Sequence, residues 1–291
     1  MVSSNKNNGK KKITEIKTFS VPFDLNEKKE IITITTNTNA PLKQPKEQII
    51  NQAFKFHSQG NISEAAKYYQ CFLDQGFKDH RVFSNYAIIL INLGKLKEAE
   101  LLLRKAIELK PDFTEAYCNL GNILKSLGKL EEAELSTRKA IELKPNFAQA
   151  HSNLGTILKC FGKLKEAELS IRKAIEIDPN YAEAHYNLGN MLRALGQLKE
   201  AELSIRKTIE LKPNFADAHY VLGIVSSALG KIDEAILNFE RSLTIKPTMS
   251  EAIVGLGQSL LVKGQYIKAL NLIKKGDGNI SFDLEHGVSI Y

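Results

Sequence analysis

Apolar residues recur at helical spacing along most of the chain, in short segments that polar residues and glycines separate. The stretch 114–147 shows the pattern most clearly. Its first half places apolar side chains three or four residues apart from Tyr117 to Leu127, and its second half repeats this from Leu130 to Leu143. Because residues at these intervals share one face of a helix, each half predicts an amphipathic helix. The stretch therefore predicts two antiparallel helices joined by a turn.

The same stretch recurs in near copy every 34 residues in both directions. Seven units align without a gap, and we bound them at 46–79, 80–113, 114–147, 148–181, 182–215, 216–249 and 250–275. A fixed period of this size is typical of a solenoid, in which each unit buries its apolar face against its neighbours. We therefore expect an all-α fold of about seven helix-turn-helix repeats.

Small residues hold fixed places in these units. The fifteenth place is glycine in all seven: Gly60, Gly94, Gly128, Gly162, Gly196, Gly230 and Gly264. Glycine ends a helix in the left-handed conformation at least strain, so this place predicts the turn between the two helices. The eighth place is Ala or Gly, which predicts that the two helices approach closely there. Where proline ends a second helix, we expect the Asn or Asp after it, such as Asn146, to cap the next helix.

A small residue at place 8, alanine at place 20, a small residue at place 27 and proline at place 32 resemble the tetratricopeptide repeat family. The resemblance covers about four fifths of the chain and departs from the pattern only in the first and last units, as at Phe72 and Gly276. The units are most similar to the repeats of O-linked N-acetylglucosamine transferase, a likeness that concerns the repeats alone and carries over no catalysis. The resemblance implies a right-handed superhelix whose inner surface is lined by the first helix of each unit.

The two ends of the chain fall outside the repeats. Residues 1–45 are rich in Lys, Asn and Thr, a composition that seldom folds alone, so we expect a flexible basic arm. Its β-branched piece 31–36 would form one short strand if a partner offered an edge. In residues 276–291 apolar and polar residues alternate around Gly287, which predicts a strand-like tail or a small hairpin. We expect this tail either to cover the last repeat or to begin a separately encoded domain.

Charge and cysteine content narrow the class of protein. The formal net charge is +7, but eight Lys against four acids place +4 of it in residues 1–45, so the repeats are close to neutral. We therefore do not expect nucleic acid as the partner. Cys71, Cys118 and Cys160 have no paired spacing, which indicates free thiols in a reducing compartment. Since no stretch approaches about 18 apolar residues, we expect a soluble, cytoplasmic protein that does not span a membrane.

We find no signature of catalysis or of a cofactor. His151, His185 and His219 occupy place 4 of three successive units, which suggests a row of metal ligands. Neighbouring helices, however, pack about 8 to 10 Å apart, whereas two imidazoles on one zinc need their nitrogens within about 4 Å. We therefore interpret the three histidines as packing between helices. We expect no cofactor, no metal and no enzyme activity from this chain alone.

One constellation is a candidate binding site. Asparagine holds place 6 of the first five units: Asn51, Asn85, Asn119, Asn153 and Asn187. In the family that the repeats resemble, places 2, 5, 6, 9, 12 and 13 line the concave groove, and asparagines there grip a peptide main chain. An amide donates and accepts at once, so it pairs with the N–H and C=O of any extended residue. Beside the row stand Asn122 and Asn190 at place 9 and Lys125, Lys159 and Arg193 at place 12.

The alternative for these asparagines is that they are simply common at this place and only cap or solvate the inner helix face. The two-carboxylate clamp that other members of the family use needs Lys at place 5. Here that place holds Ile50, Ser84, Cys118, Ser152, Tyr186 and Tyr220, so we expect no such clamp.

The sequence therefore predicts a non-catalytic scaffold for protein–protein interaction. Its partner would be a protein or peptide that lies as an extended segment in the concave groove, with acidic side chains to match the basic edge. The alternative function is the substrate-recognition part of a glycosyltransferase or oxygenase system whose catalytic domain is elsewhere. Nucleic-acid binding ranks third, because the repeats are close to neutral.

Overall fold

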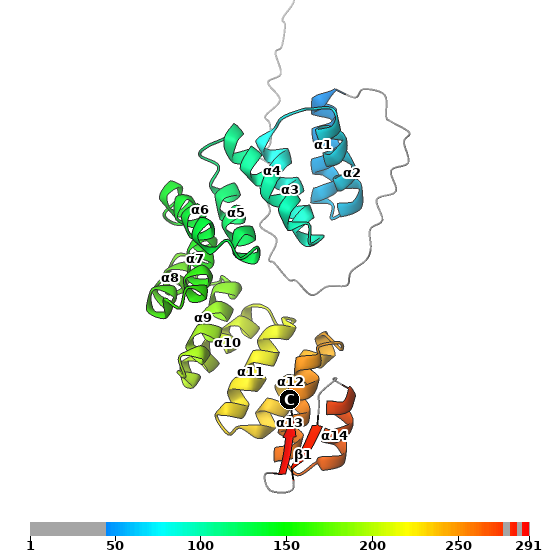
Figure 1. Ribbon diagram of the computed structural model, residues 1–291, viewed down its shortest axis with the longest axis vertical. Coiled ribbons are helices and arrows are strands. Elements are labelled where there is room, and N and C mark those ends of the chain that lie inside the picture. The colour runs from blue at the N-terminus through cyan, green and yellow to red at the C-terminus, as the bar shows by residue number, and fades with distance from the viewer. Residues whose placement is uncertain (1–44, 276–279, 284–286, 291) are drawn as a thin grey trace, which may run out of the picture. The chain divides into compact units, whose positions relative to one another are not determined.

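The computed structural model describes residues 45–275, 280–283 and 287–290 (Figure 1). The piece 31–36, for which the sequence suggests a strand, and the rest of the arm before residue 45 lie outside the described residues. The chain divides into two compact units, residues 1–95 and 96–291, and each is described by itself.

In its described residues, 45–95, the first unit contains three helices, α1 (Lys46–Ser58), α2 (Ile62–Asp74) and α3 (His80–Asn92). Its core is aromatic around Tyr69, whose ring centroid lies 5.7 Å from that of Tyr86 and 6.2 Å from that of Phe54. The Tyr69 hydroxyl is 2.9 Å from Nδ1 of His57. Tyr69 and Phe72 are fully buried, so Phe72 replaces the usual small residue at place 27 by filling the core of this unit.

The second unit contains the remaining helices in antiparallel succession. They are α4 (Leu96–Leu109), α5 (Thr114–Ser126), α6 (Leu130–Leu143), α7 (Ala148–Cys160), α8 (Leu164–Ile177), α9 (Ala182–Ala194), α10 (Leu198–Leu211), α11 (Ala216–Ala228), α12 (Ile232–Ile245), α13 (Ser250–Val262) and α14 (Tyr266–Lys275). From α4 to α14 each helix packs against the next, and the first helices α5, α7, α9, α11 and α13 also contact one another directly (Figure 1). The prediction of an all-α fold built from helix pairs is confirmed.

Two short strands follow α14. The strands β1 (Ile280–Asp283) and β2 (Gly287–Ile290) pair antiparallel, with Ile280 opposite Ile290 and Phe282 opposite Val288. The tail thus forms the small hairpin that the alternating pattern predicts. Whether it covers the last repeat stays a prediction.

The regular spacing of glycines along the chain has two distinct physical causes, one at place 15 and one at place 8. At place 15 every glycine has a φ between 72° and 80°, which is the left-handed conformation that closes the turn between first and second helix. At place 8 the cause is space: a Cβ built on Gly155 would meet the side chain of Ile171 on α8 and lie 2.9 Å from the carbonyl oxygen of Ala167. Place 8 therefore faces the second helix of the same unit.

The predicted helix caps at the junctions are wrong by one residue. The caps of α5, α7, α9 and α11 are aromatic, and none makes a side-chain hydrogen bond to the helix: Phe113, Phe147, Tyr181 and Phe215. The Asn or Asp before each of these aromatic residues lies in a turn. A main-chain bond closes the turn: before α5, for example, the N–H of Phe113 donates to the carbonyl of Lys110 at 3.1 Å. The aromatic carbonyl then accepts the first helical bond, from Ala116 at 3.1 Å in α5.

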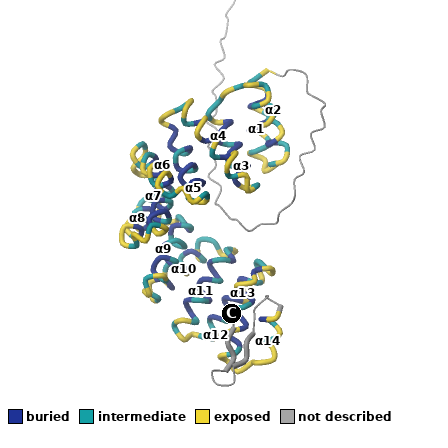
Figure 2. The backbone as a smooth tube through the Cα atoms, viewed as in Figure 1, coloured by how far each residue is buried: buried dark blue, intermediate teal, exposed yellow. Residues whose placement is uncertain are grey.

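Burial is uneven between the two kinds of helix. First helices such as α9 and α11 are mostly buried or half-buried, whereas second helices such as α6 and α8 show exposed residues along one side (Figure 2). Five of the described second helices, α4, α6, α8, α10 and α12, present an exposed leucine at place 22: Leu101, Leu135, Leu169, Leu203 and Leu237. Among the described helices, none is both long and apolar enough to cross a membrane.

Candidate functional site

Place 6 lies on the side of each first helix that turns away from the second helix. In α7, Gly155 at place 8 faces α8, and Asn153 precedes it by two residues. At about 100° per residue, two residues amount to about 200°, which puts the two side chains on nearly opposite sides of the helix. We call Asn119, Asn153 and Asn187, one on each of α5, α7 and α9, the asparagine row.

Two members of the asparagine row also bond to the preceding first helix. The Nδ2 of Asn187 donates to the hydroxyl of Ser152 at 3.0 Å, and the Nδ2 of Asn153 lies 3.3 Å from Sγ of Cys118. Both partners stand at place 5 of the unit before. The Nδ2 of Asn153 also lies 3.5 Å from the carbonyl oxygen of Cys118, whereas Asn187 uses one N–H. Among the described residues, the Oδ1 of both amides has no hydrogen-bond partner. The three asparagines are half-buried, so part of each remains open to solvent.

The other candidate asparagines differ in their surroundings. Asn190 donates to the main-chain carbonyl of Tyr186 at 3.3 Å, and Asn122 is half-buried on α5. In the first unit of the structure, Asn51 is exposed and the half-buried Asn85 reaches the hydroxyl of Tyr69.

The three cations at place 12 form no ion pair with any described carboxylate. Lys125 is half-buried and donates from Nζ to the hydroxyl of Thr156 at 3.2 Å, and burial lowers the pKa of this lysine. Lys159 is exposed. Arg193 is half-buried, and its Nε is fully covered without a hydrogen-bond partner. These positive charges are therefore not neutralised within the described part of the chain.

The arginines of the second helices behave differently. Arg138 pairs with Glu134 at 2.7 Å, and Arg172 pairs with Glu168 at 2.8 Å and with Glu200 at 3.3 Å. Arg104 and Arg206 likewise pair with carboxylates on their own helix and on the next second helix. The contrast therefore separates these four arginines, which have carboxylate partners, from the three cations at place 12, which have none among the described residues.

The histidines at place 4 each hold a helix start to the loop before it. His151 Nε2 lies 2.9 Å from the carbonyl oxygen of Pro145, His185 Nε2 lies 2.9 Å from that of Pro179, and His219 Nε2 lies 3.0 Å from that of Pro213. Within the described ranges no group of three or more His, Cys, Asp or Glu is placed to hold a metal ion. The proline at place 32 of the preceding unit, six residues before each histidine, is a sequence signal for this bond that the interpretation of the histidines alone did not use.

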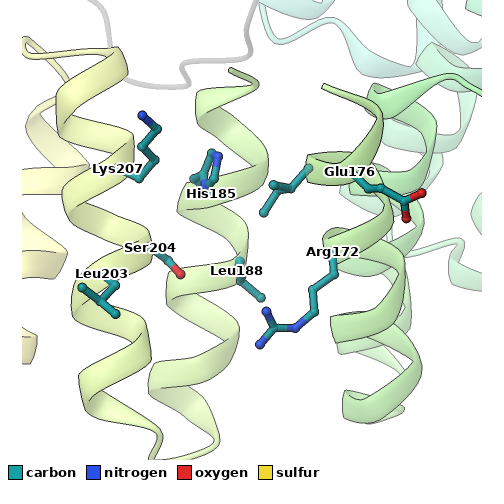
Figure 3. A pocket seen from close by; sticks show the side chains of 8 residues that line it. Arg172, Glu176, His185, Leu188, Leu203, Ser204 and Lys207 are labelled. Carbon is teal, nitrogen blue, oxygen red and sulfur yellow. The ribbon is translucent and has the colours of Figure 1, made fainter. Parts of the chain in front are cut away.

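A hollow of about 480 Å³ lies on another side of α9, between α8 and α10 (Figure 3). His185 and Leu188 form its floor, and Arg172, Glu176 and Lys207 stand around it. These three charged groups are engaged within the chain, since Lys207 pairs with Glu210 at 2.6 Å and Glu176 with Lys173 at 2.6 Å. The hollow therefore offers no uncommitted charge to a ligand.

Family profiles match the repeats directly. Profiles described as Tetratricopeptide repeat match residues 114–147, 148–181, 171–202 and 216–249, and a profile described as TPR repeat matches residues 89–128. Together they cover just over half of the chain. The chain is a tetratricopeptide repeat protein. The matches at 114–147, 148–181 and 216–249 coincide with three of the units bounded above.

Solved structures of other tetratricopeptide repeat proteins share the fold. One from Parabacteroides merdae is 18% identical, with a TM-score of 0.61 over 80% of this chain and 92% of that chain. TTC0263 from Thermus thermophilus is 21% identical, with a TM-score of 0.56 over 63% of this chain and all of that one. YrrB, described as a tetratricopeptide repeat protein with an unusual peptide-binding site, is 29% identical over 60% of this chain and 90% of its own, with a TM-score of 0.49. No curated protein sequence matches the chain.

Proposed function

We propose that this tetratricopeptide repeat protein is a non-catalytic scaffold that holds an extended peptide segment along the asparagine row. Proteins of this repeat class generally serve as interaction scaffolds, and the coarse function follows from the family. The peptide site is the finer claim. It is supported by the amide groups of Asn153 and Asn187, whose carbonyl oxygens have no partner among the described residues, and by the second N–H of Asn187, which has none either.

The geometry of an extended strand suits these free groups. A main chain offers N–H and C=O groups at every residue, and an amide side chain pairs with either regardless of the side chain that the peptide carries. Because α5, α7 and α9 contact one another in sequence, their asparagines follow one line across three helices. A receptor surface held by packed helices loses little entropy on binding.

The observation that carries the proposal further is the set of cations at place 12, which have no carboxylate partner among the described residues. Lys125, Lys159 and Arg193 accompany the asparagine row on the same three helices. A partner with acidic side chains would complement them. We therefore propose an extended segment that carries Asp or Glu, and we keep the cytoplasm as the expected compartment.

The test replaces Asn119, Asn153 and Asn187 together by Ala. Wild type and the triple variant are then compared for the peptides that each binds from a library of random peptides with both ends blocked. Wild type is expected to enrich extended acidic peptides, and the triple variant should bind them at least tenfold more weakly, since each satisfied bond removed costs about 1 kcal/mol. The matched control replaces Asn146, Asn180 and Asn214, which are exposed asparagines of the junction turns. Equal binding by both triple variants would remove the asparagine row from the function.

The alternative is that the array recognises substrates for a glycosyltransferase or oxygenase domain encoded elsewhere. The likeness of the repeats to those of O-linked N-acetylglucosamine transferase stays a prediction, because the profiles that match concern tetratricopeptide repeats in general. Both functions use the same face, so the library experiment serves both. Copurification of the chain with a catalytic protein would favour this alternative.

A further inference from the structure

Three side chains of α9 form one stripe on the side of that helix toward α11. Tyr186, Asn190 and Arg193 are spaced four and three residues apart, so they lie one above another along the helix. The ring of Tyr186 packs against that of Phe215, the residue before α11, with centroids 4.9 Å apart. The charge of Arg193 also acts on the hydroxyl of Tyr220 on α11. Arg193 therefore lies where α9 and α11 meet, between two tyrosines.

The unpaired state of Arg193 has a specific cause in the neighbouring repeat. At the equivalent place 12 of α5, Lys125 reaches across to place 9 of the next first helix and donates to the hydroxyl of Thr156 at 3.2 Å. Place 9 of α11 is Ile224, which has no atom that accepts a hydrogen bond. The Nε of Arg193 is consequently buried without a partner, whereas its two terminal nitrogens are not among the buried orphan atoms.

The two tyrosines near Arg193 each offer an O–H donor. Burial raises the pKa of Tyr186, against which the hydrogen bond with Asn190 and the charge of Arg193 act. Burial also raises the pKa of Tyr220. Both phenols therefore keep their O–H at neutral pH. The charges of Asp217 and Glu251 are felt by Tyr186 and Tyr220 respectively, yet among the described residues no carboxylate forms an ion pair with Arg193.

We propose that Arg193, together with the hydroxyls of Tyr186 and Tyr220, is a subsite for one carboxylate group of the bound segment. A guanidinium supplies donors only, each phenol adds an O–H donor, and an ionised carboxylate accepts only, so the hydrogen-bonding groups match as well as the charges. The subsite rests on the proposed function, since the asparagine row would bring the segment to it. The carboxylate comes either from an Asp or Glu side chain or from the end of a chain.

The first experiment observes Arg193 itself. The experiment follows the Nε–H NMR resonance of Arg193 in ¹⁵N-labelled full-length protein, which is assigned by its absence in Arg193→Gln. The protein is titrated with sodium acetate and, in a parallel sample at equal ionic strength, with sodium chloride. A saturable shift of this resonance with acetate alone is expected. Identical responses to acetate and chloride would overturn the subsite whatever the fate of the peptide site.

The second experiment uses three synthetic peptides of alternating Gly and Ser. One has a central Glu and both ends blocked, one has Gln in place of Glu, and the third is the Gln peptide with a free carboxyl end. Wild type should bind at least one carboxylate peptide about tenfold or more tightly than the blocked Gln peptide, which is the scale of a charge-assisted bond. The two carboxylate peptides distinguish a side chain from a chain end.

Two variants separate the subsite from the scaffold. Arg193→Gln should bind all three peptides equally, and Ile224→Thr, which gives Arg193 the internal acceptor that Lys125 has, should reduce the preference while keeping the charge. A preference for carboxylate that survives in Arg193→Gln contradicts the subsite. If none of the peptides binds wild type, the proposed peptide function fails, and the acetate titration alone then decides whether Arg193 binds carboxylate.

Discussion

Asn187 on α9 donates its side-chain Nδ2 to the hydroxyl of Ser152 on α7 across 3.0 Å. The bond joins place 6 of one repeat to place 5 of the repeat before, so it orients the amide and ties two first helices together. It also means that a substitution in the asparagine row disturbs stability as well as binding. The two effects can be separated through Ser152, which does not itself belong to the row.

Ser152→Ala should lower the free energy of unfolding by about 0.5–1.5 kcal/mol, because it removes a buried hydroxyl group and leaves the Nδ2 of Asn187 without its acceptor. The amide itself remains, so peptide binding should change by less than in Asn187→Ala. Urea unfolding of Ser152→Ala, Asn187→Ala and the double variant gives the coupling between them. Additive losses in this cycle would show that the bond contributes nothing to stability.

Glu202 on α10 is a buried carboxylate that joins α10 to the turn between α11 and α12. It accepts from Nζ of Lys231 at 2.8 Å and from Nη2 of Arg206 at 2.8 Å, and the bonds with Lys231 and then Arg206 lower its pKa against the effect of burial. A carboxyl group whose pKa is lowered on folding stabilises the folded protein. This contribution is complete at pH values above the ordinary pKa of 4.5, and it is lost as the pH falls through the lowered pKa of the folded state.

Glu202→Gln should therefore destabilise the protein by about 1–3 kcal/mol at pH 7, and the difference from wild type should shrink in acid. Urea titrations across this pH range measure it. The matched control is Glu210→Gln, which removes an exposed pair with Lys207 and should cost below about 1 kcal/mol. A difference from wild type that stays constant with pH would contradict the assignment.

The two glycines of one repeat should respond differently to the same substitution. Gly155→Ala forces a methyl group against Cγ1 of Ile171 and should cost about 1–3 kcal/mol. In the background of Ile171→Ala, which removes that atom, Gly155→Ala should cost less. Gly162→Ala meets no atom within 4 Å but has a φ of 73°, so it should cost roughly 1 kcal/mol through backbone strain alone, with or without Ile171→Ala. Equal rescue of both, measured by thermal unfolding, would contradict the steric explanation.

His57 in the first unit should make stability depend on pH. Burial beside Tyr69 lowers its pKa, so the unfolded chain takes up the proton at a higher pH than the folded chain does. This stability is complete above the ordinary value of 6.5 and falls as the pH drops below it, by at most about 1.4 kcal/mol per pH unit. His57→Gln should remove that part of the slope. The check is urea unfolding of both proteins from pH 7.5 downward, and parallel slopes would refute it.

The fold was predictable because its signals are local and repeated. The glycine at place 15 marks the position of each turn. Its left-handed φ is accessible because glycine has no Cβ. The prediction of the caps at the junctions failed because the helix begins one residue after the Asp or Asn. The N–H of Phe113 closes the turn on Lys110 and its carbonyl accepts the first helical bond, so Phe113 and not Asp112 is the capping residue, and residue type alone does not reveal this shift.

For the candidate site, the repeat pattern predicts the helix face of each residue but not its bonds. Place 6 puts Asn153 on the side of α7 away from α8, yet its partner Cys118 belongs to another repeat, and a propensity for one helix cannot name it. The same holds for Arg193, whose lack of a partner depends on Ile224 in the following unit. Reading place 12 of each unit against place 9 of the next would have found it.

The turn at each place-15 glycine is built alike from α5 to α12, and each place-8 glycine in this span lies against the residue at place 24 of its own unit, which is Thr137, Ile171, Ile205 or Phe239. The units therefore share one backbone frame, whereas the side chains that fill it differ. Excision or duplication of one 34-residue module would keep this frame, and for the modules 114–147, 148–181 and 182–215 it would change the number of place-6 asparagines by one. Under the proposed function, the length of peptide that the asparagine row spans is thus counted in whole modules, and each new junction needs its side-chain contacts refitted.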